Sequence, residues 1–189
     1  MKVKLSRYHI GVLVLYIFVI PLCFVLFPTQ LRYAPTSDNL GFVTGALVLA
    51  VLSFLYFVWP RNFQLAHPSG ARVLMASLYG LLFAIPEEII FRGVVQGYFL
   101  TQYVNGAAIV LFSALFFGAA HLPNGARGVS PRDWNWKFFW LSSVAGLPLG
   151  LLFLLTKSLL IPTLLHTFFL AGLKLFRNSN LETGHPSEA

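Results

Sequence analysis

Charged side chains are scarce in this sequence. Only 10% of the 189 residues are charged, whereas a soluble domain contains roughly 25%. Apolar residues make up 57% of the chain, so a soluble fold would leave a large apolar surface in contact with water. The shortage of charge therefore excludes an ordinary soluble domain and predicts an integral membrane protein.

Cysteine is almost absent as well. Cys23 is the single cysteine, which excludes an intrachain disulfide and a cysteine-based metal site. Acidic residues number 6 against 13 Lys and Arg, and the net charge is +7. The basic residues lie mainly between the apolar runs, which favours a role in membrane orientation over nucleic-acid binding. We expect the lipid bilayer, and no nucleic acid, as a partner.

Long apolar runs dominate what remains. They cover residues 10–27, 41–59, 73–101, 106–121, 138–156 and 159–176, and a membrane-spanning helix needs about 20 such residues. The predicted fold class is all-α, a polytopic membrane bundle of about six transmembrane helices. We expect one domain over residues 1–177 and a polar, disordered tail over 178–189. The run 73–101 is long, so we expect it to tilt, to kink near Pro86 or to extend into the interface.

The distribution of Lys and Arg predicts the orientation. Six spans place both termini on the same side of the membrane, and cytoplasmic loops carry the excess of basic residues. Most Lys and Arg fall on the side of the N-terminus, including Lys2 and Lys4 near the start and Lys174 and Arg177 near the end. We therefore predict a multi-pass protein of the cell membrane with both termini in the cytoplasm.

Two glutamates and an arginine interrupt the run 73–101. At mid-bilayer, Glu87, Glu88 and Arg92 cost about 2.5–3.5 kcal/mol each on insertion scales, so each needs a partner. Glu88 and Arg92 are four residues apart, in the order that favours an ion pair on one helix face. Glu87 lies about 100° further around the helix. This separation leaves Glu87 for a different partner.

Two histidines lie in later apolar runs, His121 at the end of 106–121 and His166 within 159–176. At about 1.5 Å per residue, Glu87 and His121 both lie about 21 Å from the turn that joins their helices. On the same count, His166 lies only about 10 Å from that side of the membrane. We expect Glu87 and His121 to meet, with His166 at a shallower level.

Small residues predict close packing of the same two helices. Gly93 and Gly97 have the G-x-x-x-G spacing, and Gly118 is followed by two alanines before His121. Glycines at such spacing let the backbones of membrane helices approach each other. We therefore expect helices 73–101 and 106–121 to approach closely at these residues.

The order and spacing of these residues resemble the CAAX protease and bacteriocin-processing family of intramembrane proteases, which includes the type II CAAX prenyl endopeptidases. The family has the motifs E-E-x-x-x-R, F-x-x-x-H and H-x-x-x-N. The matching residues are Glu87, Glu88 and Arg92 for the first motif, Phe117 and His121 for the second, and His166 for the third, where Leu170 replaces the asparagine. The resemblance covers about residues 72–176.

This resemblance implies a glutamate-dependent endopeptidase that hydrolyses a peptide bond of a membrane-anchored protein or peptide without a cofactor. Glu87 and His121 would activate a water molecule, and His166 would stabilise the oxyanion. Leu170 cannot donate a hydrogen bond, so Thr163, on the same face as His166, is our own candidate for the second donor. Prenylated C-terminal tails, bacteriocin leaders and membrane-anchored sorting tails are all compatible substrates.

Three other functions remain open from the residues alone. Glu87, His121 and His166 are ordinary zinc ligands, which would give a zinc-dependent membrane endopeptidase, although no H-E-x-x-H motif is present. Intramembrane carboxylates and histidines also mark proton pathways. A non-catalytic membrane binding or immunity protein is the third, since Leu170 departs from the motif. For a protease, we expect the cleft to open toward the cytoplasm, because His121 lies at that end of its helix.

Overall fold

The computed structural model describes residues 7–29, 31, 44, 47–48, 51, 69–103, 105–124 and 130–176. Its helices are α1 (Arg7–Leu26), α3 (Gly70–Glu88), η1 (Ile89–Gln96), α4 (Gly97–Gln102), α5 (Gly106–Ala120), α6 (Trp136–Thr156) and α7 (Leu160–Phe176). These bounds confirm five of the six predicted helices. The run 41–59 lies almost wholly outside the described residues, and the tail 178–189 lies entirely outside them, so the sixth helix and the disordered tail stay predictions.

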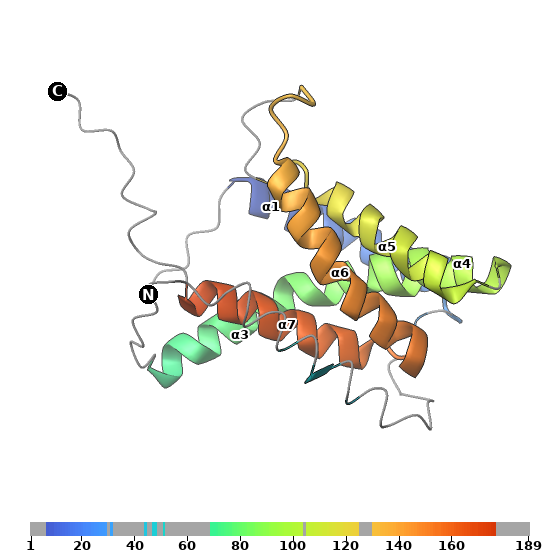
Figure 1. The fold of residues 1–189 in the computed structure, drawn as a ribbon. Coiled ribbons are helices and arrows are strands. Elements are labelled where there is room, and N and C mark those ends of the chain that lie inside the picture. The colour runs from blue at the N-terminus through green and yellow to red at the C-terminus, as the bar shows by residue number, and fades with distance from the viewer. Residues whose placement is uncertain are drawn as a thin grey trace.

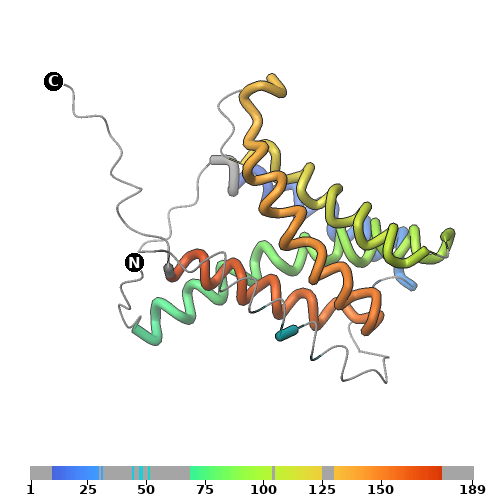
Figure 2. The backbone as a smooth tube through the Cα atoms, viewed as in Figure 1, coloured from blue at the N-terminus to red at the C-terminus, as the bar shows by residue number. Residues whose placement is uncertain are grey.

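The elements α3, η1 and α4 form one helix of 33 residues, Gly70–Gln102, which Figure 2 shows as a continuous backbone. Pro86 lies inside α3 without ending it, although proline removes a backbone hydrogen bond from a helix interior. Three residues later the helix widens into η1, a π-helix of 8 residues. Short π-helical turns interrupt α-helices and are frequent at functional sites. The predicted irregularity near Pro86 therefore takes the form of this wider segment.

The helices pack mainly as two pairs, α3 with α7 and α5 with α6 (Figure 1). Glycines allow both contacts. A Cβ on Gly80 would lie 2.7 Å from the carbonyl oxygen of Thr167 in α7, and a Cβ on Gly118 would lie 2.6 Å from the carbonyl oxygen of Phe139 in α6. Such distances are too short for a side chain, so at these two places only glycine fits.

This pairing corrects the predicted glycine contact. Gly118 faces α6, and a Cβ on Gly93 would meet Leu31 and Leu159, so neither glycine lies between helix Gly70–Gln102 and α5. The prediction assumed an α-helical period through Gly93, but the π-helical segment begins at Ile89 and changes which face each later residue occupies. Helix α5 contacts η1 at Phe91, whose ring lies 5.1 Å from the Phe117 ring, centre to centre, and whose carbonyl oxygen accepts a hydrogen bond from Ser113 Oγ at 3.0 Å.

Two of the described helices, Gly70–Gln102 and Trp136–Thr156, are long and apolar enough to cross a membrane. Three more are apolar but shorter: Ile10–Leu26, Gly106–Ala120 and Leu160–Leu175. Large apolar side chains point outward from all of them, among them Ile17, Phe18, Leu74, Leu78, Phe112, Phe116, Trp140, Leu164 and Phe168. An exposed apolar surface of this extent suits contact with lipid.

The interior of the bundle contains polar side chains that link the helices. Arg92 Nη2 donates to the Gly146 carbonyl oxygen at 3.1 Å, and Gln96 Nε2 donates to the Gly150 carbonyl oxygen at 2.7 Å. Arg92 and Gln96 are both fully buried on η1, and both acceptors belong to α6. These two bonds attach the π-helical segment, and the glutamates that precede it, to α6.

Candidate active site

A cavity of about 370 Å³ lies beside the two glutamates. Five described helices contribute to its wall, which is mostly apolar. Its polar lining residues are Tyr16, Tyr79, Glu87, His121, Asn124, Ser142 and His166. An apolar cavity with a few convergent polar groups is the usual form of a binding site. The predicted residues Glu87, His121 and His166 therefore share one cavity, with Phe117 and Leu170 also in its wall.

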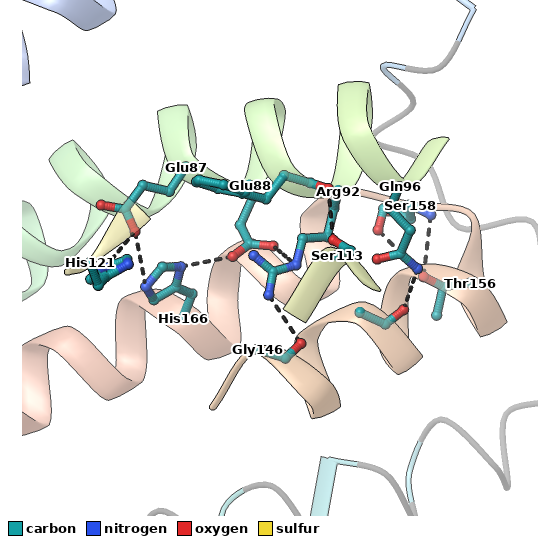
Figure 3. A network of polar contacts seen from close by, with 12 residues as sticks. Glu87, Glu88, Arg92, Gln96, Ser113, His121, Gly146, Thr156, Ser158 and His166 are labelled. Atoms are coloured by element: carbon teal, nitrogen blue, oxygen red, sulfur yellow. Dashed lines mark hydrogen bonds and ion pairs between the residues drawn. The ribbon is translucent and has the colours of Figure 1, made fainter. Parts of the chain in front are cut away.

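Glu88 lies outside this lining and is fully buried in a polar network (Figure 3). Its Oε2 is 3.3 Å from Arg92 Nε, which is the predicted ion pair. Its Oε1 is 2.8 Å from His166 Nδ1. Arg92 also places its guanidinium 4.6 Å from the centre of the Phe117 ring, a cation–π distance. Glu88 thus joins the arginine to a cavity histidine.

The Glu87 carboxylate lies on the other side of the His166 ring from Glu88, and two imidazoles approach it (Figure 3). Its Oε2 lies 3.8 Å from His121 Nε2 and 3.6 Å from His166 Nε2. Within the described part of the chain, this buried oxygen has no hydrogen-bond partner. The other oxygen, Oε1, accepts a hydrogen bond from the Tyr16 hydroxyl at 3.2 Å. Glu87 therefore has one oxygen bonded and one directed at two imidazole nitrogens.

The ring of His121 has a fixed tautomer when it is neutral. Its Nδ1 lies 2.8 Å from the Phe117 carbonyl oxygen, and a carbonyl oxygen can only accept, so Nδ1 carries the proton. Nε2, which faces Glu87, then presents a lone pair. The Phe117 ring packs 4.5 Å from the His121 ring and 5.6 Å from the His166 ring, centre to centre. Phe117 thus packs against both histidine rings.

His166 is deeper than the residue count predicted. The count placed it at a shallower level than Glu87, but its ring contacts both glutamates. The prediction was wrong because it treated the helices as parallel rods that start at one level. In the structure, α7 packs along α3, with the Thr167 backbone against Gly80. This close approach brings His166 to the level of the glutamates.

The proposed second oxyanion donor is not among the cavity residues. Thr163 is buried, and its hydroxyl has no hydrogen-bond partner within the described residues, but it does not line the cavity. Leu170 does line it and presents an apolar surface there. Asn124 and Ser142 also line the cavity, and no motif or spacing in the sequence predicted that they would.

Tyr16 is the residue that sequence reasoning missed and that contacts a predicted catalytic side chain. Between residues 10 and 26 it carries the only hydroxyl group. A single hydroxyl in an otherwise apolar helix is a weak indication that this residue meets a polar partner, and the sequence of this helix offers no stronger one.

A buried carboxylate that faces two imidazoles in an apolar cavity, within a bundle of apolar helices, suits acid–base chemistry on a bound water molecule. Comparison with known families identifies the class of protein. The family model for the type II CAAX prenyl endopeptidase, Rce1-like, matches residues 68–171, more than half of the chain. The protein belongs to this family of membrane peptidases, and the resemblance expected over 72–176 is confirmed.

A comparison with curated proteins found no match, and neither did a comparison with solved structures.

Proposed function

We propose that the protein is an intramembrane endopeptidase in which Glu87 and His121 activate a water molecule for attack on a peptide bond. The observation that carries the proposal is the free oxygen of Glu87, which is buried, lacks a hydrogen-bond partner among the described residues and faces two imidazole nitrogens. A carboxylate in this setting is an efficient proton acceptor. The His121 lone pair on Nε2 provides a second acceptor for the same water.

The two histidines have different roles in this mechanism. Glu88 is paired with Arg92, so it accepts a hydrogen bond from Nδ1 of His166. When the His166 ring carries a proton on both nitrogens, its Nε2–H faces Glu87 and the cavity. This N–H donates a hydrogen bond to the oxyanion that forms when water adds to the scissile carbonyl. Glu88 and Arg92 act through His166 and are positioning residues.

The bond changes balance without another reactant. The water oxygen bonds to the scissile carbonyl carbon while Glu87 takes one water proton, and the carbonyl becomes an oxyanion beside His166. When the carbon–nitrogen bond breaks, the proton held by Glu87 passes to the leaving amine. The direct products are a carboxylic acid and a free amine, and at neutral pH the acid then releases its proton and the amine takes one up.

The substrate we propose is a membrane-associated protein or peptide that enters the apolar cavity in extended form. Most of the cavity wall is apolar, so it favours apolar side chains on either side of the scissile bond. CAAX-type tails, sorting tails and leader peptides all meet this requirement. Among the described residues, no group of three or more His, Cys, Asp or Glu side chains is arranged to hold a metal ion, and the proposed steps use none.

The test is cleavage of membrane-anchored peptides by the purified protein in liposomes, with and without a metal chelator, followed by mass spectrometry of the products. Cleavage that survives the chelator supports the glutamate mechanism and rejects a zinc-dependent enzyme. Cleavage that the chelator removes and added zinc restores would instead favour zinc. No cleavage of any peptide class, with proton flux across the liposome membrane, would favour the proton pathway.

We further propose that the cavity opens toward the cytoplasm and that both termini lie on that side. Asn124 follows His121 and lines the cavity, so it reports the side to which the cavity opens. In a Cys23→Ala background, Asn124→Cys is expected to react with a membrane-impermeant maleimide only after the cells are permeabilised. Labelling of intact cells would refute the orientation.

A further inference from the structure

Helix α1 reaches the active site although the family model begins only at residue 68. Val12, Leu15 and Tyr16 of α1 line the cavity together with Glu87. Val12 and Leu15 add apolar wall. Tyr16 adds a hydroxyl, and it donates that hydroxyl to Glu87 Oε1 at 3.2 Å.

The hydroxyl of Tyr16 bonds Oε1 of Glu87, the oxygen that neither histidine approaches. His121 and His166 both approach Oε2, whereas Tyr16 bonds Oε1. The last torsion of a glutamate side chain is broad, with no sharp staggered minimum to hold the carboxylate plane. A donor on one oxygen is therefore needed to keep the other oxygen directed at the histidines.

We propose that Tyr16 is a positioning residue of the active site: its hydroxyl holds the Glu87 carboxylate so that Oε2 faces His121 and His166. The proposal rests on the assignment of Glu87 as the catalytic base. Because the hydroxyl bonds the enzyme and not the substrate, its loss lowers the rate of the chemical step and leaves substrate binding unchanged. Helix α1 is then part of the catalytic unit.

The variant that tests this is Tyr16→Phe, which keeps the ring in the wall and removes only the hydroxyl. We expect kcat to fall at least about tenfold, the effect of losing a hydrogen bond to a charged group, with KM and the thermal midpoint unchanged. The matched control is Tyr98→Phe. Tyr98 packs against the residue that directly follows α1, with its ring 6.2 Å from that of Phe27, but it does not line the cavity.

A second measurement separates positioning of Glu87 from a general effect on the fold. Glu87→Asp keeps the carboxylate but shortens the side chain, so the Tyr16 contact is already lost. In this background, Tyr16→Phe is expected to reduce kcat by less than twofold, because residues that act through one contact are not additive. An equal loss of kcat in both backgrounds overturns the proposal, and so does an equal loss in Tyr98→Phe.

Different results would refute the proposed function and the role of Tyr16. If Glu87→Gln retains cleavage, the proposed function is wrong and the role of Tyr16 falls with it. If Glu87→Gln is inactive while Tyr16→Phe keeps full kcat, the catalytic base stands and only the role of Tyr16 is refuted. A rise in KM with an unchanged kcat in Tyr16→Phe would also refute it, since that result assigns the hydroxyl to substrate binding.

Discussion

The two adjacent glutamates are expected to respond differently to the same substitution. Glu87→Gln preserves the shape of the side chain and still accepts the hydrogen bond from Tyr16, but it removes the proton acceptor. We expect turnover to fall by at least about 10²–10⁴-fold, the usual contribution of a general base, with the thermal midpoint nearly unchanged. Glu88→Gln removes a charge that is fully buried beside Arg92 and is expected to destabilise the protein.

The magnitude for Glu88 follows from its contacts. It lies 3.3 Å from Arg92 and 2.8 Å from His166, and both side chains are buried. Breaking a buried ion pair by removing one partner costs about 3–5 kcal/mol, because the other charge is left uncompensated. The amide of glutamine can still meet His166, so we expect residual activity at low temperature and a lower thermal midpoint.

The assay measures peptide cleavage and thermal unfolding on the same detergent-purified samples of wild type and both variants. Near-normal cleavage by Glu87→Gln would refute the assignment. A Glu88→Gln protein that is stable but inactive, beside a Glu87→Gln protein that unfolds, would require the two roles to be exchanged.

Three further predictions concern the fold. Gly118→Ala is expected to destabilise by about 1–3 kcal/mol, because a Cβ there collides with α6. Gly11→Ala, with nothing within 4 Å, is the control and is expected to leave the midpoint unchanged or raise it. Lys157 has φ of 52°, so Lys157→Gly is expected to stabilise by about 1 kcal/mol in chemical unfolding. Gln96→Leu removes a buried hydrogen bond to α6 and is expected to lower the free energy of unfolding by about 0.6–1.7 kcal/mol. The control is Gln102→Leu at an exposed position, which is expected to lower it by less. The measurement is hydrogen exchange of the α6 backbone amides.

The contacts that the sequence predicted are those within one helix or between adjacent helices. Glu88 and Arg92 pair because they are four residues apart on one helix. Glu87 and His121 approach because a short turn joins their helices and equal residue counts place them at one level. Such contacts depend on helical spacing and chain order, which a sequence states directly.

The contacts that were missed depend on how distant helices cross. His166 reaches the glutamates because α7 packs closely along α3, and no residue count reports a crossing. Tyr16 is 71 residues from Glu87 along the chain, and its helix joins the cavity through apolar packing that has no motif. Gly93 was assigned to the wrong neighbour because no sequence rule anticipated the π-helical segment at Ile89.

The ion pair between Glu88 and Arg92 also bears on the biogenesis of the protein. Helix Gly70–Gln102 is synthesised before α5, α6 and α7, so it enters the bilayer before most partners of its charges exist. The glutamate and the arginine neutralise each other within one helix, which lowers the cost of their transfer from the translocon into lipid. Glu87 finds its hydrogen-bond donor, Tyr16, on a helix that is already made. The chain order therefore allows the most polar span to be inserted before the two cavity histidines, His121 and His166, are translated.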